Sequence, residues 1–148
     1  GVERLCLEPR KKVFIVFVDI NVLDHDGNLI DASEYAALAA LLTSKMPEYE
    51  IKDGEVILKD THQPLPMNNY PVAVTFAKVG KTLMVDPSIK EEDSMTTRLT
   101  VGIDKDDCVC AMQKGGKGEL DIDEIKSAVD AAIQKSRELR TLIMEAAK

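Results

Sequence analysis

The sequence contains few aromatic residues and few cysteines, and it has no tryptophan. Aromatic residues make up 4% of the 148 residues, so a platform on which bases stack is not expected to be its main binding device. The cysteines are Cys6, Cys108 and Cys110, an odd number without the paired spacing of a disulfide framework. We therefore expect small, buried, reduced cysteines and an intracellular, cytoplasmic protein.

Histidine and long apolar runs are also scarce. Only His25 and His62 accompany the cysteines, so a four-ligand zinc site has weak support. Neither histidine neighbours a candidate nucleophile in the sequence, and a Ser-His-Asp or Cys-His catalytic set is therefore not supported. No run of about 18 apolar residues occurs, so no transmembrane helix is expected.

Positive charge is in deficit, with 19 Lys and Arg against 26 Asp and Glu and a net charge of −7. A free-standing nucleic-acid-binding domain is normally basic, so a partner or a further segment would have to supply positive charge for such a role. The length suggests one domain, large enough to bury a core without disulfides or metals. A composition of 45% hydrophobic and 30% charged residues is typical of a soluble globular protein.

An apolar segment precedes an alanine-rich helix in the first third of the chain. Residues 12–23 (KVFIVFVDINVL) are rich in β-branched and aromatic side chains, which predicts a long strand buried on both faces. A turn over 24–28 follows. A helix is then predicted over about 32–45, with Asp31 as N-cap and Glu34 completing a capping box. Because this helix is small and apolar on nearly every side, we expect it to be buried.

Residues 48–71 are predicted to form an irregular connection between two lobes. An Asp-Gly pair within them predicts a small hairpin over 51–58. The residues after this hairpin are predicted to form a linker because they contain Pro64, Pro66 and Pro71.

Antiparallel hairpins and a long helix are predicted for residues 72–148. The first hairpin joins 72–76 to 82–85, and the second joins 98–103 to 108–113. The closing helix, over about 122–147, begins with an Asp121–Glu124 capping box. It carries one apolar stripe at helical spacing, formed by Ile122, Ile125, Val129, Ala132, Ile133, Leu139 and Ile143. The fold class is therefore α+β, with mixed or antiparallel sheets packed against helices.

The chain offers an acidic and a basic candidate site. Asp86, Glu91, Glu92 and Asp93 could hold Mg²⁺ through one or two carboxylates, or they could form a solvated acidic loop that caps a helix. The turn 114–118 (KGGKG) lacks the spacing of a phosphate-binding P-loop. Its lysines are weak candidates for contacts to RNA phosphates, namely Lys114 and Lys117.

Four segments, in this order and spacing, resemble a known family. They are 22–32 (VLDHDGNLIDA), 70–74 (YPVAV), 83–93 (LMVDPSIKEED) and 112–120 (MQKGGKGEL). They resemble RNase PH-like proteins, in particular the non-catalytic RNase PH-like ring subunits of the archaeal exosome, over essentially the whole chain. The resemblance implies the RNase PH-like fold, with 1–47 as the end of a first lobe and 72–148 as a second lobe. We expect the chain to be the C-terminal part of a longer polypeptide whose N-terminal part carries RNA-contacting arginines.

The resemblance also implies that two catalytic features of the family are degraded. Catalytic members bind phosphate with a glycine pair followed by Thr-Arg or Ser-Arg. The corresponding residues are Gly27, Asn28, Leu29, Ile30 and Asp31. Catalytic members also carry two aspartates six residues apart, and here Asp93 fits the first while Leu99 replaces the second. Because leucine can neither bind Mg²⁺ nor transfer a proton, no catalytic, phosphate-binding or metal-binding residue is expected in this subunit.

The implied function is that of a catalytically silent subunit in a hexameric ring that degrades RNA from its 3′ end by phosphorolysis. This subunit would support the active site of a catalytic RNase PH-like partner in a heterohexamer and help line the RNA channel. It would need no cofactor itself, whereas the complex would use inorganic phosphate and Mg²⁺ at the partner's site. The expected partners are that subunit, RNA-binding cap proteins and single-stranded RNA, and no membrane.

Two alternatives remain open from the sequence. The chain could itself be an active phosphorolytic exoribonuclease in which Glu91, Glu92 and Asp93 hold the metal. It could also be a binding module unrelated to RNA that shares the fold, because a fold alone does not decide function.

Overall fold

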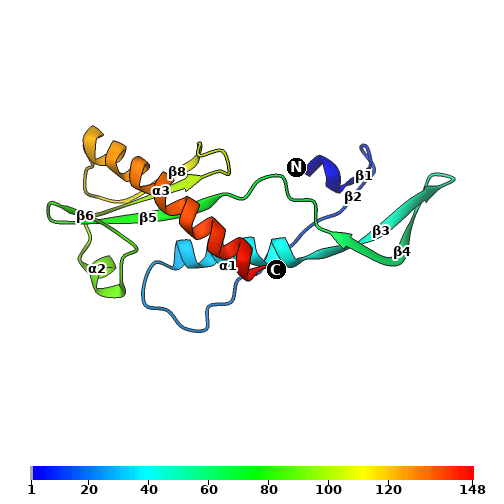
Figure 1. The fold of residues 1–148 in the computed structure, drawn as a ribbon, viewed down its shortest axis with the longest axis horizontal. Helices are drawn as coiled ribbons and strands as arrows, with labels where there is room; N and C mark the ends of the chain where they lie inside the picture. Colours follow the sequence, from blue (N-terminus) through cyan, green and yellow to red (C-terminus); the bar gives the residue numbers. More distant parts are fainter. Residues whose placement is uncertain (1) are drawn as a thin grey trace.

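The computed structural model describes residues 2–148 and shows an elongated α+β fold (Figure 1). The elements, in chain order, are η1 Val2–Leu5, β1 Cys6–Glu8, β2 Lys12–Val13, α1 Leu29–Thr43, β3 Lys45–Lys52, β4 Glu55–Pro64, β5 Val72–Val79, β6 Thr82–Val85, α2 Ile89–Ser94, β7 Thr97–Ile103, β8 Val109–Gly116 and α3 Ile122–Ala146. A four-stranded antiparallel sheet in the order β6-β5-β7-β8 lies toward one end, and the β3–β4 hairpin projects at the other (Figure 1). None of the helices in the described residues is long and apolar enough to cross a membrane.

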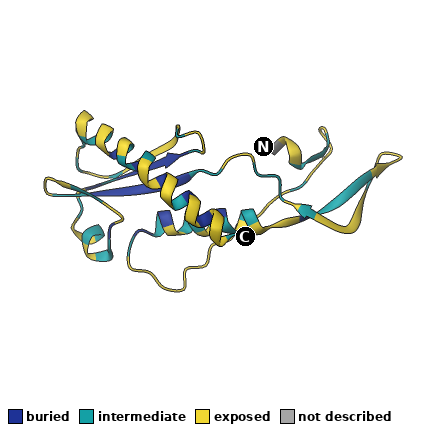
Figure 2. Ribbon diagram, in the orientation of Figure 1, coloured by how far each residue is buried: buried dark blue, intermediate teal, exposed yellow. Residues whose placement is uncertain are grey.

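The main core lies between this sheet and α3. Alternate residues of the two central strands face the helix, because side chains alternate between the faces of a sheet. Val74 pairs with Val101 and Phe76 with Leu99 across the strands. They pack with the small residues of α3, Ala128 and Ala132, and the central strands are the most buried part of the molecule (Figure 2).

The two hairpins and the closing helix predicted for residues 72–148 are confirmed, whereas the short helix α2 was not predicted. Both hairpins form as expected. The Asp121 carboxylate accepts a hydrogen bond of 2.8 Å from the Glu124 amide, and the Glu124 carboxylate accepts one of 2.9 Å from the Asp121 amide. From Ile125 onward the predicted apolar stripe packs on the core and is buried or partly buried, but Ile122 is 67% exposed because it lies at the first turn of the helix.

The predicted start of α1 is wrong by three residues. The helix begins at Leu29, with Asn28 as the N-cap at φ 45°, and Asp31 lies within its first turn. No capping box with Glu34 forms, because the Asp31 carboxylate bonds to β5 instead. The helix is also less buried than predicted, since Asp31 and Leu38 are its buried residues.

A long hairpin occupies most of the region expected to be irregular. Strands β3 and β4 pair from Lys45–Pro64 to Lys52–Glu55, so much of 48–71 is regular. Asp53 and Gly54 have φ values of 51° and 80°, as a two-residue hairpin turn requires. The Asp-Gly signal was therefore correct, and the structured region around it is longer than predicted.

The predicted buried strand over 12–23 is also wrong. Only Lys12–Val13 is a strand, paired with β1, and residues 14–23 have no regular structure. Phe17 is 81% and Leu23 97% exposed. The Phe14 amide donates to the Leu5 carbonyl at 2.8 Å. In the part of the chain that the structure describes, no strand pairs with residues 15–23, and their side chains are exposed.

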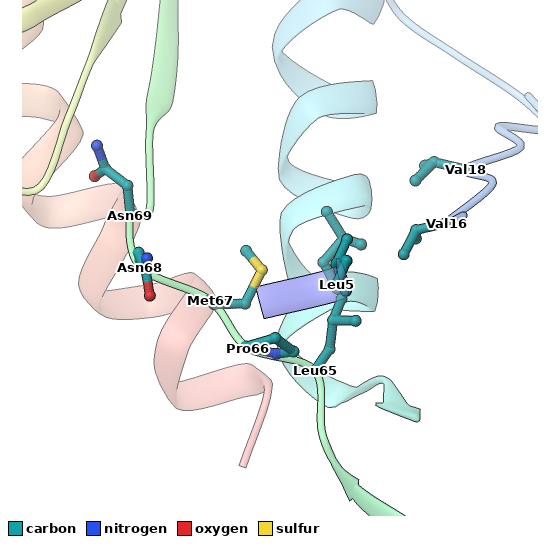
Figure 3. A pocket seen from close by; sticks show the side chains of 9 residues that line it. Leu5, Val16, Val18, Leu65, Pro66, Met67, Asn68 and Asn69 are labelled. Carbon is teal, nitrogen blue, oxygen red and sulfur yellow. The ribbon is translucent and has the colours of Figure 1, made fainter. Parts of the chain in front are cut away.

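An apolar pocket of about 350 Å³ borders this exposed segment. In Figure 3, Val16 and Val18 lie across the pocket from Met67, with Leu5 and Leu65 between them. Helix α1 contributes Leu41 to the wall. The pocket and the exposed segment therefore form one apolar surface.

Candidate functional site

The candidate site lies at the start of α1, where two loops distant in the sequence meet. Gly27 forms an isolated bridge with Ser88, and the Ile89 amide donates to the Asp26 carbonyl at 3.2 Å. Gly27 has a φ of 101°, and a Cβ there would lie 2.4 Å from the Pro87 carbonyl oxygen. Glycine is therefore required both by the backbone conformation and by the close approach of the loops.

Asn28 connects the two loops. Its side-chain nitrogen donates to Asp31 Oδ2 at 2.9 Å and to Asp86 Oδ1 at 2.7 Å. Its backbone amide donates to Glu92 Oε1 at 3.1 Å. Only the amide NH₂ group can donate to two carboxylates, so these contacts fix the orientation of the side chain, which is 5% exposed.

Asp31 extends this network into the sheet. Its carboxylate is 3% exposed and accepts from the Thr75 amide at 2.8 Å and the Thr75 hydroxyl at 2.6 Å. The Thr75 and Thr100 hydroxyl oxygens lie 2.9 Å apart. Because a buried carboxylate is costly without donors, these contacts explain how the sheet tolerates an acidic residue here.

Side chains of α1 also cover an open edge of β5. Strand β6 pairs with β5 only from Phe76 to Val79, which leaves the backbone groups of Ala73 and Thr75 without a strand on that side. Glu34 Oε2 accepts from the Ala73 amide at 3.2 Å, and the Tyr35 hydroxyl donates to the Ala73 carbonyl at 2.8 Å. The start of α1 thus replaces the missing strand.

Burial changes the acidity of both groups at this edge. Burial, reinforced by the nearby charge of Asp31, raises the pKa of Glu34 from 4.5 to about 7. Burial also raises the pKa of the Tyr35 hydroxyl, and the Asp31 charge adds to that effect. The region is therefore rich in carboxylates and poor in compensating positive charge.

This arrangement is unfavourable for an inorganic anion. The free amides and dipole at a helix start usually attract phosphate, but here Glu92, Asp86 and Asp31 surround Asn28 at that position. A phosphate would be repelled by these carboxylates and would compete with Glu92 for the Asn28 amide. The adjacent residues Leu29 and Ile30 offer no side-chain donor.

The acidic residues of the second loop serve local structure. Glu91 accepts from the Ser88 amide and hydroxyl, each at 2.8 Å, as a capping box of α2. These hydrogen bonds lower the pKa of Glu91. Glu92 binds Asn28, and Asp93 is exposed. Within residues 2–148, no group of three or more His, Cys, Asp or Glu side chains is placed to hold a metal ion.

The structure places Asp93 at the surface and Leu99 in the core. Asp93 is exposed on α2, whereas Leu99 is 2% exposed in the core beneath α3. The next residue of β7, Thr100, points to the opposite face and reaches Thr75. Position 99 is thus a core position in this chain, and sequence spacing alone did not reveal which face it occupies.

Lys114 and Lys117 are exposed at the end of β8 and in the turn that follows. Lys114 Nζ donates to the Gly116 carbonyl at 2.9 Å. The turn is anchored by the Gly118 amide, which donates to the Thr96 carbonyl at 2.9 Å. Both lysines are therefore accessible, and their contact with RNA stays a prediction.

Asn28 and Thr75 belong to the site but are not predicted by the sequence, and the predicted burial of two cysteines is wrong. The signal that could have identified Asn28 is its residue type, because asparagine tolerates a positive φ better than most residues. Nothing in the sequence pointed to Thr75. Cys108 and Cys110 are exposed, contrary to the prediction, because Cys110 lies on the edge strand β8 and Cys108 lies in the turn that precedes it.

Two family profiles match this sequence. The profile described as "3′ exoribonuclease family, domain 1" matches residues 1–47, and "3′ exoribonuclease family, domain 2" matches residues 69–135. Together they cover most of the chain. The chain belongs to the 3′ exoribonuclease (RNase PH) family.

Curated members of this family are similar over nearly the whole chain. "Exosome complex component Rrp42" of Thermococcus gammatolerans is 46% identical over 146 residues, covering 97% of this chain and 54% of the relative. The protein of the same name from Methanothermobacter thermautotrophicus is 43% identical, covering 93% of this chain and 51% of the relative. The chain thus spans about half the length of the curated relatives it matches.

Solved structures agree with the family assignment. A chain of "Archaeal exosome core" is 42% identical with a TM-score of 0.84, covering 96% of this chain and 55% of that chain. A chain of an Archaeoglobus fulgidus exosome "with RNA bound to the active site" is 41% identical with a TM-score of 0.68, covering 80% and 44%. Rice Rrp46, at 13% identity and a TM-score of 0.59 over 84% and 50%, shares the fold. The RNase PH-like α+β fold expected from the sequence is confirmed.

Proposed function

We propose that this chain is part of a non-catalytic subunit in an exosome ring that degrades RNA from the 3′ end by phosphorolysis. The relatives named Rrp42 and the exosome structures at 41–42% identity support membership in such an assembly. The observation that carries the non-catalytic role is the Asn28 site. Catalytic members of the family are expected to bind phosphate at the start of this helix. Here Asn28 instead donates hydrogen bonds to three carboxylates.

Phosphorolysis needs groups that this site does not supply. An oxygen of inorganic phosphate attacks the terminal phosphodiester phosphorus, which releases a nucleoside 5′-diphosphate and leaves a 3′-hydroxyl on the shortened RNA. The attacking dianion must be held by donors or cations close to the RNA phosphate, but Asp31, Asp86 and Glu92 repel it. Leu99, buried in the core, cannot act as an acid or a metal ligand.

The proposed role is therefore structural. The catalytic RNase PH-like partner supplies the phosphate-binding and Mg²⁺-binding groups in a cytoplasmic heterohexameric ring, and RNA-binding cap proteins deliver single-stranded RNA. This subunit supports the partner's active site and helps line the channel. Its negative charge favours a scaffold over a stand-alone RNA binder.

The competing hypothesis, an active nuclease using Glu91, Glu92 and Asp93, has less support than the structural role. The Glu91 carboxylate is engaged by Ser88 and the Glu92 carboxylate by Asn28. A metal ion would have to break these hydrogen bonds before it could bind both residues.

Reconstitution tests the proposal. The full protein alone, the catalytic partner alone and the mixed complex are each incubated with 3′-labelled RNA and inorganic phosphate. Only the mixed complex, or the partner to a lesser degree, should release nucleoside diphosphates. Phosphate-dependent release by this protein alone, or a failure to associate with the partner, would contradict the proposal.

A further inference from the structure

The side chain of Arg98 has no hydrogen-bonding partner in the part of the chain that the structure describes. Its Nε is buried and unpaired. The two terminal nitrogens are not buried, and the side chain as a whole is partly exposed. A guanidinium carries five N–H donors and a permanent charge, so a partly buried one without an acceptor is unfavourable by about 1–3 kcal/mol or more. Such a group indicates an acceptor from outside the chain.

The position of Arg98 is defined by a glycine on the neighbouring strand. Arg98 on β7 pairs with Gly115 on β8. A Cβ at Gly115 would lie 3.3 Å from the Nη2 atom and 3.6 Å from the Nε atom of Arg98. The absence of a side chain at 115 therefore lets the guanidinium lie against the backbone of β8, with its outer end facing solvent.

Arg98 lacks an acidic partner among the described residues of an acidic chain. Asp and Glu outnumber Lys and Arg by 26 to 19, and other basic residues form ion pairs, such as Arg137 with Asp107 at 2.7 Å. Among residues 2–148, no carboxylate forms an ion pair with Arg98. A free guanidinium in an acidic protein is suited to an anion carried by another molecule, and its planar fork matches the oxygens of a phosphate.

Two further cations lie close to this position in the sheet. Lys114 directly precedes Gly115 and pairs with Leu99, so its side chain lies on the α3 face, opposite to Arg98. Lys117 lies in the turn that packs over Thr96. Both are exposed. Arg98, Lys114 and Lys117 therefore give one end of the β7–β8 hairpin a local positive charge, opposite in sign to the Asn28 site.

We propose that Arg98 contacts a backbone phosphate of single-stranded RNA through its two terminal nitrogens. Lys117 adds positive charge at the same end of the hairpin without a fixed geometry. This inference rests on the proposed function, since it gives the subunit a direct RNA contact in addition to its structural role.

Two substitutions of Arg98 in the mixed complex separate the effect of its charge from that of its geometry and test this contact. Arg98→Met keeps the aliphatic stem and removes the charge, and Arg98→Lys keeps the charge without the fork. Lys126→Met is the control, because Lys126 is exposed on α3 and pairs loosely with Asp123 at 3.7 Å. The binding of a fluorescent single-stranded RNA is measured by anisotropy over a series of salt concentrations.

Removing one phosphate contact should lower the slope of log K against log salt by about 0.7 and weaken binding about fivefold at 0.1 M salt. Arg98→Lys should restore the slope and part of the affinity, and Lys126→Met should match the wild type. Arg98→Met should unfold at the same temperature as the wild type or higher, because it removes an unpaired buried donor.

Three results would overturn the inference. In the first, Arg98→Met leaves the salt slope unchanged. In the second, Arg98→Met weakens assembly of the ring but not RNA binding, which would assign the acceptor to a carboxylate of a neighbouring subunit. In the third, Arg98→Met lowers the unfolding temperature by several degrees, which would indicate an internal partner. If the wild-type complex neither binds nor degrades RNA, the proposed function fails as well, so the two failures are distinguishable.

Discussion

The junction between the two loops at Gly27 makes the sharpest prediction about stability. Gly27→Ala introduces a methyl group that would lie 2.4 Å from Pro87 O, 2.6 Å from Ser88 C and 2.7 Å from Ile89 N. All three are backbone atoms, so no side-chain rotation can relieve the contact. The 24–28 and 86–89 loops would have to separate, which would disturb the hydrogen bonds of Asn28.

Gly54 provides a matched control. It also has a positive φ, 80° against 101° at Gly27, but nothing lies within 4 Å of an added Cβ. The unfavourable backbone conformation costs about 1–2 kcal/mol in both variants. Overpacking adds about 1–3 kcal/mol, and only at Gly27. We therefore expect Gly54→Ala to lose about 1–2 kcal/mol and Gly27→Ala to lose about 2–5 kcal/mol.

Urea unfolding of the full protein, followed by circular dichroism, measures both values. Amide hydrogen exchange adds a local readout, because Gly27→Ala should accelerate exchange at Ile89, whose amide donates to Asp26. Gly54→Ala should leave that amide unchanged. Equal losses of stability in the two variants, or slow exchange at Ile89 in both, would show that the loops do not approach each other as described.

Further predictions concern single side chains, each with its own readout. Because the pKa of Glu34 is about 7 in the folded protein and 4.5 ordinarily, the folded state holds the proton more tightly, and stability should fall as the pH rises from about 4.5 to about 7 and then level off. The resulting difference in the free energy of unfolding is at most about 3 kcal/mol, and partial exposure reduces it to about 1–2 kcal/mol. Unfolding curves measured at pH 5 and pH 8 should show this difference in the wild type but not in Glu34→Gln. Asp31→Asn should lose about 2–4 kcal/mol in urea unfolding because Thr75 and Asn28 lose an ionised acceptor, whereas Asp93→Asn, at an exposed position, should change stability by less than about 0.5 kcal/mol. Arg140 is buried and donates to three backbone carbonyls at 2.7–3.0 Å. The exposed ion pair of Arg137 contributes only about 0–1 kcal/mol, so Arg140→Met should lower the thermal midpoint by much more than Arg137→Met. Equal shifts in the two variants would contradict this role of Arg140.

The sequence by itself determined the elements whose signals are local. The capping box at Asp121 and the Asp53–Gly54 turn act over a few neighbouring residues, and each produced the predicted helix start or hairpin. The antiparallel strands from Val72 to Gly116 also follow from local alternation and turns. Such features depend little on the rest of the chain, which is why they can be predicted.

The tertiary structure alone decided the start of α1, the state of residues 14–23 and the candidate site. Asp31 looked like a cap, but its carboxylate binds Thr75, 44 residues away in the sequence. Asn28 joins Asp86 and Glu92 across similar separations, and residues 14–23 have an apolar pattern without a neighbouring strand to pair with. Each outcome depends on which distant groups are brought within hydrogen-bonding or packing distance, and sequence periodicity carries no information about that.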